Sequence, residues 1–501
     1  MELMFQEYEM SSLKQVFAHT SLGEQTADVI IPDSCADVDR IVDSFGIVTI
    51  QDSQCLQDSV SVSGLVQVGI LFVGENEELN TVSARLPFSF RKDLPEIVEQ
   101  GMLSYDCRIV SVDARALNSR KLLVRAGLQC SFRVFEREVR VLKELELPSE
   151  ALQLRRTEYP MKVPTEFGEK SFNINDELEL PGSAPAITRI LKAVNRMQIL
   201  EQKAVGGKGV FKMELLLHLL YADPQEQLCT YEWRIPLSQF VDLSGDTDNA
   251  ELNTVLLLKE FDLEPDSQIE SRRLFLRLGV AAQCMALEVR TVDLIEDAYC
   301  TDAILQPQWQ QWQCRSLLDS QTIRGTAQWM GEEVAASVVD VWAYAEEGEK
   351  EAFEDQMKLR LPLHCSVLFY DTEGKLQGKQ IRPVMEAELP LHRGASCELR
   401  DCLCTEVYCN ANPRGMELRV PVQLTADSYG EQTLRSLDGG EVLPLPEASE
   451  RQPSLILRRT EGEEELWNIA KAYRTPMKAI QQANDLSSTV VPEDTMLLIP
   501  L

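Results

Sequence analysis

Cysteine and histidine are the residues of this chain that could carry metal or acid–base chemistry, but their spacing does not support either. The densest group of thiols lacks the paired Cys-x2-Cys spacing of zinc ribbons, and it comprises Cys397, Cys402, Cys404 and Cys409. The four histidines stand in no recognised catalytic pattern and lie at positions 19, 218, 364 and 392. His218 is surrounded by leucines, which is typical of a strand histidine rather than a ligand. We therefore expect no catalytic activity, no metal site and no cofactor.

The charge balance argues against two classes of partner. The chain has 501 residues with 80 acidic and 49 basic side chains, a formal net charge of −31. Such a field repels phosphate backbones and anionic lipid headgroups, so we expect neither nucleic acid nor a membrane surface as a partner. No glycine-rich phosphate-binding signature occurs, and Gly206-Gly207-Lys208-Gly209 predicts a hairpin loop instead.

The N-terminus and the cysteine usage favour an intracellular protein. Residues 1–7 contain neither a basic region nor a sustained apolar region, and no apolar stretch approaches the ~18 residues that span a bilayer. The 13 cysteines are scattered and odd in number. We expect reduced, mostly buried thiols in a cytosol, without direct membrane insertion.

The last fifty residues contain a compact pattern of elements. A strand is predicted at 454–458, followed by a helix at 464–473 that places Leu466, Ile469 and Tyr473 on one face. A second helix is predicted at 476–483, with Pro476 at its start, and a closing strand at 496–500. This order, strand, helix, helix, strand, predicts an autonomous module at 453–501, with residues 438–452 as an extended acidic linker before it.

This tail resembles the LysM family. The resemblance rests on three motifs, which are Leu466-Trp467-Asn468-Ile469-Ala470, Ile480-Gln481-Gln482-Ala483-Asn484 and Leu497-Leu498-Ile499-Pro500. The family's Gly-Asp-Thr falls on Glu463, Glu464 and Glu465, and its glycine before the last strand falls on Asp494. In glycan-binding members these two loops line the sugar groove. The resemblance implies a partner-binding or glycan-binding site made of Glu463, Glu464, Glu465, Leu466, Trp467, Asn484, Asp485 and Asp494.

The acidic loops of the tail distinguish two kinds of ligand. A neutral N-acetylated sugar gains little from carboxylates, whereas a basic protein surface gains steering and specificity. For Glu464 and Glu465 alone, stabilisation of the helix dipole is a sufficient explanation. Trp467 could stack on a sugar, although a tryptophan at a helix start usually belongs to the core of a small domain.

Ahead of the tail, the chain repeats itself. Residues 31–42, which begin Ile31-Pro32, align without a gap with residues 180–191, which lie 149 positions further on. The same offset places Val66, Val68, Ile70 and Phe72 on Leu215, Leu217, Leu219 and Tyr221. Later the offset becomes 152, so that residues 122–128 align with 274–280. A divergent third copy is indicated by 416–422, which carries Arg419 where the others carry Arg125 and Arg277, and by Leu361-Pro362 in place of Leu86-Pro87.

Within each copy the apolar residues alternate, which predicts half-buried strands. Residues 36–43 and 185–193 have apolar residues at helical spacing, which predicts one short helix per copy. The fold class is therefore multidomain and mainly β. The expected domains are three strand-rich modules at 1–155, 156–305 and 306–437, the linker at 438–452 and the tail at 453–501.

The repeats resemble the SPOCS domain of endospore-forming bacteria, through Ile31-Pro32 to Val42 and Leu180-Pro181 to Leu191. Several SPOCS modules followed by one LysM module is the layout of SipL-like spore-coat morphogenetic proteins. This resemblance implies a non-catalytic scaffold in the mother-cell cytosol, at the outer surface of the forespore. Its implied partners are a SpoIVA-like coat-basement ATPase and other coat proteins. The alternative is a LysM protein of the spore envelope that binds peptidoglycan or chitin-type glycan.

Overall fold

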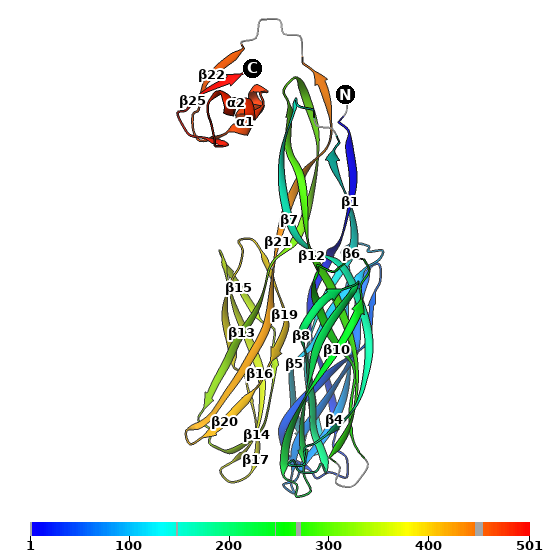
Figure 1. Ribbon diagram of the computed structural model, residues 1–501. Coiled ribbons are helices and arrows are strands. Elements are labelled where there is room, and N and C mark those ends of the chain that lie inside the picture. The colour runs from blue at the N-terminus through cyan, green and yellow to red at the C-terminus, as the bar shows by residue number, and fades with distance from the viewer. Residues whose placement is uncertain (1–2, 147–148, 246, 267–271, 446–453) are drawn as a thin grey trace.

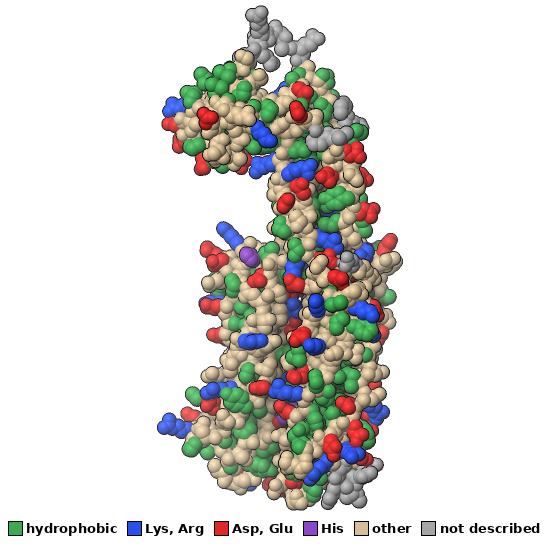
Figure 2. Space-filling model, in the orientation of Figure 1, with side chains coloured by type: hydrophobic (Ala, Val, Ile, Leu, Met, Phe, Trp, Pro, Cys, Tyr) green, Lys and Arg blue, Asp and Glu red, His purple; other side chains and the backbone are tan. Residues whose placement is uncertain are grey.

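The structure is a computed structural model that describes residues 3–146, 149–245, 247–266, 272–445 and 454–501. It is mainly β, as predicted, and both of its described helices lie in the C-terminal tail. Figure 1 shows a body of long twisted strands, a narrower stalk above it, and the tail beside the tip of the stalk, and the same three parts are visible in the space-filling view of Figure 2. Among the described residues, no helix is long and apolar enough to cross a membrane.

The strands of the body fall into three consecutive sets, and each set forms two facing sheets. The first set is β1 (Phe5–Ile30), β2 (Val38–Cys55), β3 (Ser59–Gly74), β4 (Leu79–Asp93), β5 (Met102–Asn118) and β6 (Lys121–Leu145). The second set is β7 (Leu152–Glu179), β8 (Arg189–Val205), β9 (Lys208–Ala222), β10 (Leu228–Asp242), β11 (Glu251–Pro265) and β12 (Arg273–Cys300). The third set is β13 (Ala303–Gly331), β14 (Ala335–Ala345), β15 (Glu349–Phe353), β16 (Gln356–Asp371), β17 (Leu376–Ile381), β18 (Val384–Pro390), β19 (Ser396–Cys404), β20 (Tyr408–Asn412) and β21 (Gly415–Pro444).

All three sets share one topology. One sheet has the order β1-β6-β5, which recurs as β7-β12-β11 and as β13-β21-β19. The facing sheet has the order β2-β3-β4, which recurs as β8-β9-β10. In the third set β14 pairs with β16, and β17 and β18 together take the place of the third strand. We call the three sets modules 1, 2 and 3. That each is a separate domain with the predicted boundaries stays a prediction.

The predicted repeat register is confirmed at the level of strand pairing. Arg125 faces Thr26 on β1 and Asp113 on β5. Arg277 faces Asn175 on β7 and Asp262 on β11, which are the positions 149 residues further on. Arg419 occupies β21, the counterpart strand of module 3. The alternating residues predicted to be buried are at most 1% exposed in both modules. They are Val66, Val68, Ile70 and Phe72 on β3 and Leu215, Leu217, Leu219 and Tyr221 on β9.

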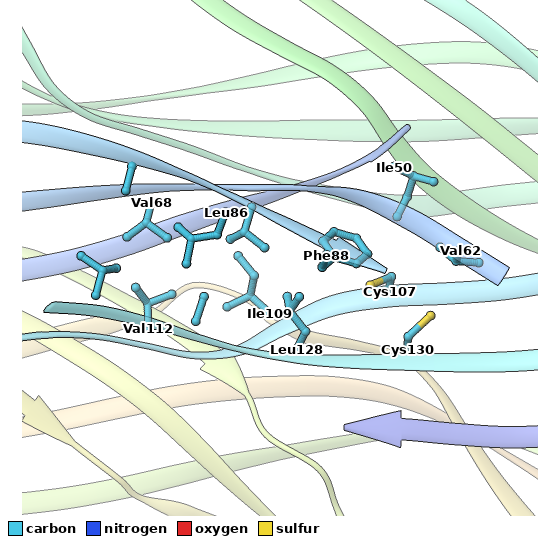
Figure 3. Packing of buried hydrophobic residues seen from close by; sticks show 14 of the residues in the cluster. Ile50, Val62, Val68, Leu86, Phe88, Cys107, Ile109, Val112, Leu128 and Cys130 are labelled. Carbon is cyan, nitrogen blue, oxygen red and sulfur yellow. The ribbon is translucent and has the colours of Figure 1, made fainter. Parts of the chain in front are cut away.

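Facing sheets enclose the core of each module. In module 1, Val68 and Leu86 from one sheet pack against Ile109 and Leu128 from the other (Figure 3). Alternating side chains from both inner faces interdigitate there, which is the usual packing of a β-sandwich. Cys107 and Cys130 lie at the same level of this core and are opposite each other on β5 and β6. All 13 cysteines of the chain are free thiols.

The predicted short helix in each copy is wrong. Val38–Cys55 and Arg189–Val205 are strands, and both contain register shifts near their beginning. These β-bulges lie between Val38 and Arg40 and between Ile41 and Asp43 in β2, with one between Ile190 and Lys192 in β8. An extra residue interrupts the alternation of faces, so buried residues recur at a spacing that imitates a helix. The placement of Leu361-Pro362 is also wrong, because it lies on β16, the counterpart of β3 rather than of β4.

The three modules share a core at their common interface. Its members come from all three modules and occupy equivalent strand positions. Leu71 on β3, Leu220 on β9 and Leu368 on β16 are at most 1% exposed, and they meet Val42, Leu191 and Trp342 there. Because aliphatic side chains from three modules are buried in one cluster, we expect the modules to form a single packed body rather than independent domains joined by linkers.

Above the body, three antiparallel ribbons continue into the stalk. Phe5–Gln15 pairs with 135–145, Leu152–Pro164 with 287–300, and Ala303–Leu317 with 429–444. Their inward-facing residues form two further small cores, which include Leu142, Leu294 and Leu434. The linker prediction is wrong for 438–444, because these residues extend β21 along β13. Residues 446–452 of the predicted linker lie outside the described residues.

The tail has the predicted βααβ order. It consists of β22 (Leu455–Arg459), β23 (Glu464–Glu465), α1 (Leu466–Tyr473), α2 (Met477–Ala483), β24 (Val490–Val491) and β25 (Met496–Pro500). Leu466, Ile469 and Ile480 are fully buried, as predicted, and pack with Leu497 and Ile499. β22 and β25 form the two-stranded sheet that covers the helices.

Candidate functional site

The acidic loops of the tail are held together by a single threonine. Thr460 is 1% exposed, and its hydroxyl donates to the carbonyl of Pro492 at 2.7 Å and accepts from the amide of Thr495 at 3.0 Å. Its carbonyl accepts from the amide of Asp494 at 3.2 Å. The loop after β22 and the loop before β25 therefore form one rim, and this rim carries most of the predicted site residues.

Three of the predicted acids are engaged in ion pairs. Glu464 pairs with Arg458 at 2.8 Å and Asp494 pairs with Arg459 at 3.0 Å, both within the tail. Glu465 reaches out of the tail and pairs with Arg155 on β7 at 2.8 Å. Part of the predicted acidic field is therefore neutralised by the chain's own arginines.

The other three acids around these loops remain open to solvent. Glu463, Asp485 and Glu493 are exposed and form no ion pair with any residue that the structure describes. Asp485 also has a positive φ of 50°, directly after the end of α2. The unpaired acidic charge of this rim thus comes from these three residues and from Glu461, which is also exposed and forms no ion pair with any described residue.

Trp467 belongs to the contact between the tail and the stalk. Its side chain is 8% exposed, and its indole Nε1 donates to Asp297 Oδ2 on β12 at 2.8 Å. The rings of Tyr299 and Trp467 form a T-shaped contact, with 5.1 Å between the ring centroids. Leu466, the neighbouring predicted residue, is fully buried in the core of the tail. Neither side chain is available in this arrangement as a platform for a sugar ring.

Asp297 and Tyr299 contact the candidate site from the stalk, and the sequence reasoning missed both of them. Lys471 also pairs with Asp297, at 2.5 Å, and the hydroxyl of Tyr299 donates to the carbonyl of Thr475 at 2.9 Å. Burial raises the pKa of Asp297, but hydrogen bonds from Lys471 and Trp467 outweigh it and lower the pKa overall. No local pattern marks these residues, because their partners lie 170 or more positions away in the chain.

Asn484 has a structural role. Its amide nitrogen donates to the carbonyls of Ile480 and Leu498, and its Oδ1 accepts from the amide of Leu498 at 2.7 Å. The side chain thus satisfies the outer edge of β25 as a neighbouring strand would. Because every hydrogen-bonding group of this amide is engaged, the residue joins α2 to the sheet rather than facing a ligand.

A second cluster of charged residues lies in the core shared by the modules. Lys192 Nζ lies 2.7 Å from Asp43 and 3.0 Å from Asp340, and all three side chains are at most 2% exposed. His218 pairs with Asp340 at 2.7 Å and with Glu232 at 3.1 Å. Burial lowers the pKa of His218, but its hydrogen bonds to both carboxylates outweigh this effect and raise the pKa to about 9. Two cations and two buried carboxylates therefore balance, which makes the cluster a structural element of the interface.

The thiols and carboxylates show no metal centre in the part of the chain that the structure describes. No group of three or more His, Cys, Asp or Glu side chains there could hold a metal ion. Cys404 and Cys409 are buried, and burial raises the pKa of each thiol, to about 12 and about 11 respectively. Both cysteines pack among the apolar residues of module 3.

Two family models match the chain. The model of the SipL, SPOCS domain matches residues 37–117, which span β2 to β5 of module 1. The model of the LysM domain matches residues 463–500 of the tail. No curated protein and no solved structure matches. Both resemblances drawn from the motifs are confirmed, whereas SPOCS repeats in modules 2 and 3 stay a prediction.

Proposed function

We infer that this chain, a sporulation protein with a SipL-type SPOCS domain and a C-terminal LysM module, is a non-catalytic scaffold of endospore coat assembly. In this function the LysM module docks onto a SpoIVA-like coat-basement ATPase at the forespore surface, on the mother-cell side. The rigid three-module body presents further surfaces to other coat proteins.

The environment of Trp467 is the observation that carries this proposal. A LysM module that binds glycan through the face of Trp467 needs an accessible aromatic side chain and free polar groups at its loops. Here the indole is buried against Tyr299 and bonded to Asp297, and the amide of Asn484 is fully engaged. These contacts favour a module that binds protein over one that binds sugar.

The open acids of the rim suggest the kind of protein surface that is recognised. Glu463, Asp485 and Glu493 form no ion pair within the described chain, so they can attract a basic surface of the partner. Exposed charges act over about 8 to 10 Å at physiological salt, so the rate of association should fall as salt increases.

Surface plasmon resonance with the immobilised coat-basement ATPase tests the proposal. The full chain should bind and a chain that ends at residue 452 should not. A triple variant, Glu463→Gln, Asp485→Asn and Glu493→Gln, should associate more slowly and lose its salt dependence. The matched control neutralises the exposed acids of module 1, Glu75, Glu96 and Glu99. Equal binding by the truncated chain would contradict docking through the LysM module.

A further inference from the structure

The three modules enclose a cavity where the stalk meets the body. Its volume is about 200 Å³, and strands of all three modules line it. Phe135 on β6, Leu287 on β12 and Tyr429 on β21 contribute to its walls. Neither the LysM module nor its rim takes part, so this feature is independent of the proposed function.

Three buried polar atoms, each on a residue that lines this cavity, have no hydrogen-bond partner among the described residues. They are the Nε of Arg133, the Nε1 of Trp312 and the Oδ1 of Asn253. Trp312 is 7% exposed and Asn253 is 8% exposed, and all three residues line the cavity. An unsatisfied buried donor or acceptor costs about 1 to 3 kcal/mol, so three of them around one space indicate that something polar occupies it.

The charge of the cavity differs from that of the whole chain. Its lining includes four cationic side chains, Lys14, Arg133, Arg140 and Arg315, against two acids, Glu138 and Glu431. Glu398 accepts from Arg133 and Arg315 and is the third carboxylate at this site. Four positive charges against three negative ones leave an excess of one positive charge, in a protein whose formal net charge is −31.

The cationic groups are also fixed in position by aromatic rings. The guanidinium of Arg140 lies 4.3 Å from the centre of the Trp312 ring, and that of Arg315 lies 4.0 Å from the centre of the Tyr429 ring. Arg315 additionally donates to Gln15 Oε1 at 2.6 Å. The wall therefore combines apolar side chains with polar groups that are fixed in position, and such polar groups orient a ligand in a small-molecule site.

We propose that this cavity binds a small organic acid that carries an amino group and an apolar body, the chemistry of an α-amino acid. The carboxylate accepts from Arg133 Nε and Trp312 Nε1, both of which lack another acceptor. The ammonium donates to Asn253 Oδ1 and faces the carboxylate of Glu431, while the apolar body packs on Phe135 and Leu287. A ligand at this junction would contact all three modules at once.

Isothermal titration calorimetry on the full chain tests the proposal. The probes are L-leucine, L-phenylalanine and L-glutamate, with isoamylamine and phenethylamine as the matched amines that lack the carboxylate. We expect saturable binding at one site by at least one amino acid and none by its amine. Absence of saturable binding by all three amino acids would overturn the proposal and leave a cavity that holds only water, and equal binding by the amine would overturn the assignment of the carboxylate.

Two variants localise the binding. Trp312→Phe keeps an aromatic ring under Arg140 and removes only the unpartnered N–H, so affinity should fall about tenfold. Asn253→Ala should weaken binding by a similar factor. Trp309→Phe is the matched control, because Trp309 lies on the same strand beneath Arg435 and outside the cavity. Near-ultraviolet circular dichroism checks that each variant is folded, and unchanged affinity in both folded test variants would contradict the site.

Discussion

Asp43 of module 1 and Lys192 of module 2 occupy equivalent positions, 149 residues apart, and form an ion pair of 2.7 Å inside the core that the modules share. Asp340, 148 residues after Lys192, completes the set from module 3. Three copies of one strand position thus meet at one point, where the ammonium of Lys192 is within ion-pair distance of both aspartates. Identical charges at these positions would repel, so the sequence difference between the copies specifies this arrangement.

Replacement of Lys192 by methionine should destabilise the whole body. It leaves two buried carboxylates next to each other with only His218 to balance them, and the loss of one partner of a buried pair costs about 3 to 5 kcal/mol. Urea unfolding of the full chain measures the change. The matched control is Lys212→Met, whose ion pair with Glu201 is solvent-exposed and contributes roughly 0 to 1 kcal/mol. Similar losses in the two variants would contradict the role of the cluster.

His218 should make stability depend on pH. Its pKa is about 9 in the folded protein against an ordinary value of 6.5, because Asp340 and Glu232 favour its charged form despite burial. A raised pKa means that the folded state binds the proton more tightly than the unfolded chain. The contribution is therefore complete below pH 6.5 and is lost as the pH rises through 9.

Chemical unfolding at several pH values between 6.5 and 9 tests whether stability changes with pH in this direction. The free energy of unfolding should fall with rising pH, and His218→Gln should remove most of this slope. His19→Gln is the control, because His19 is an exposed residue of β1. A slope that is the same in His218→Gln and in the unmodified protein would show that other groups cause the dependence.

Asp297→Ala should release the LysM module from the stalk. The carboxylate accepts from both Trp467 and Lys471, and hydrogen bonds to a charged group contribute about 1.5 to 3 kcal/mol each. Hydrogen exchange followed by mass spectrometry should show faster exchange in 466–475, with no change in module 1. The control is Asp293→Ala, on the same strand, whose partner is Arg156. If 466–475 exchange at the same rate in both variants, Asp297 does not hold the module.

The tail and the repeats were predictable because their signals are local or periodic. Leu466, Ile469 and Ile480 follow helical spacing, and the residues of β3 and β9 alternate in matched register. The bulged beginnings of β2 and β8 misled the prediction, since an extra residue changes the spacing of buried positions.

The contacts between modules were not predictable in the same way. Asp43, Lys192 and Asp340 look like ordinary surface charges in the sequence, and only the 149-residue offset hinted that the first two are equivalent. The burial of Trp467 was correctly expected. Its hydrogen-bond partner Asp297 could not be predicted, because it lies 170 residues away. Such pairs depend on how completed sheets pack, and no pattern of neighbouring residues encodes that.

The isolated tail, residues 453–501, should unfold in one cooperative thermal transition. Ile469 is fully buried in its core, so Ile469→Ala should cost roughly 2 to 5 kcal/mol and abolish the transition. Asn468→Ala is the control at an exposed position of the same helix. Because Tyr299 of the stalk belongs to the same core, the fragment should be less stable than the module in the full chain. A fragment without any cooperative transition would contradict an autonomous module.

The choice between protein and glycan as the ligand of the LysM module is the central claim, and titration of the full chain with chitin and peptidoglycan oligomers tests it most directly. The contacts of Trp467 and Asn484 predict no saturable binding of the full chain up to millimolar oligomer. Saturable binding at micromolar oligomer that is lost on substitution of Asp485 or Asp494 would contradict the scaffold function and establish the module as a glycan receptor.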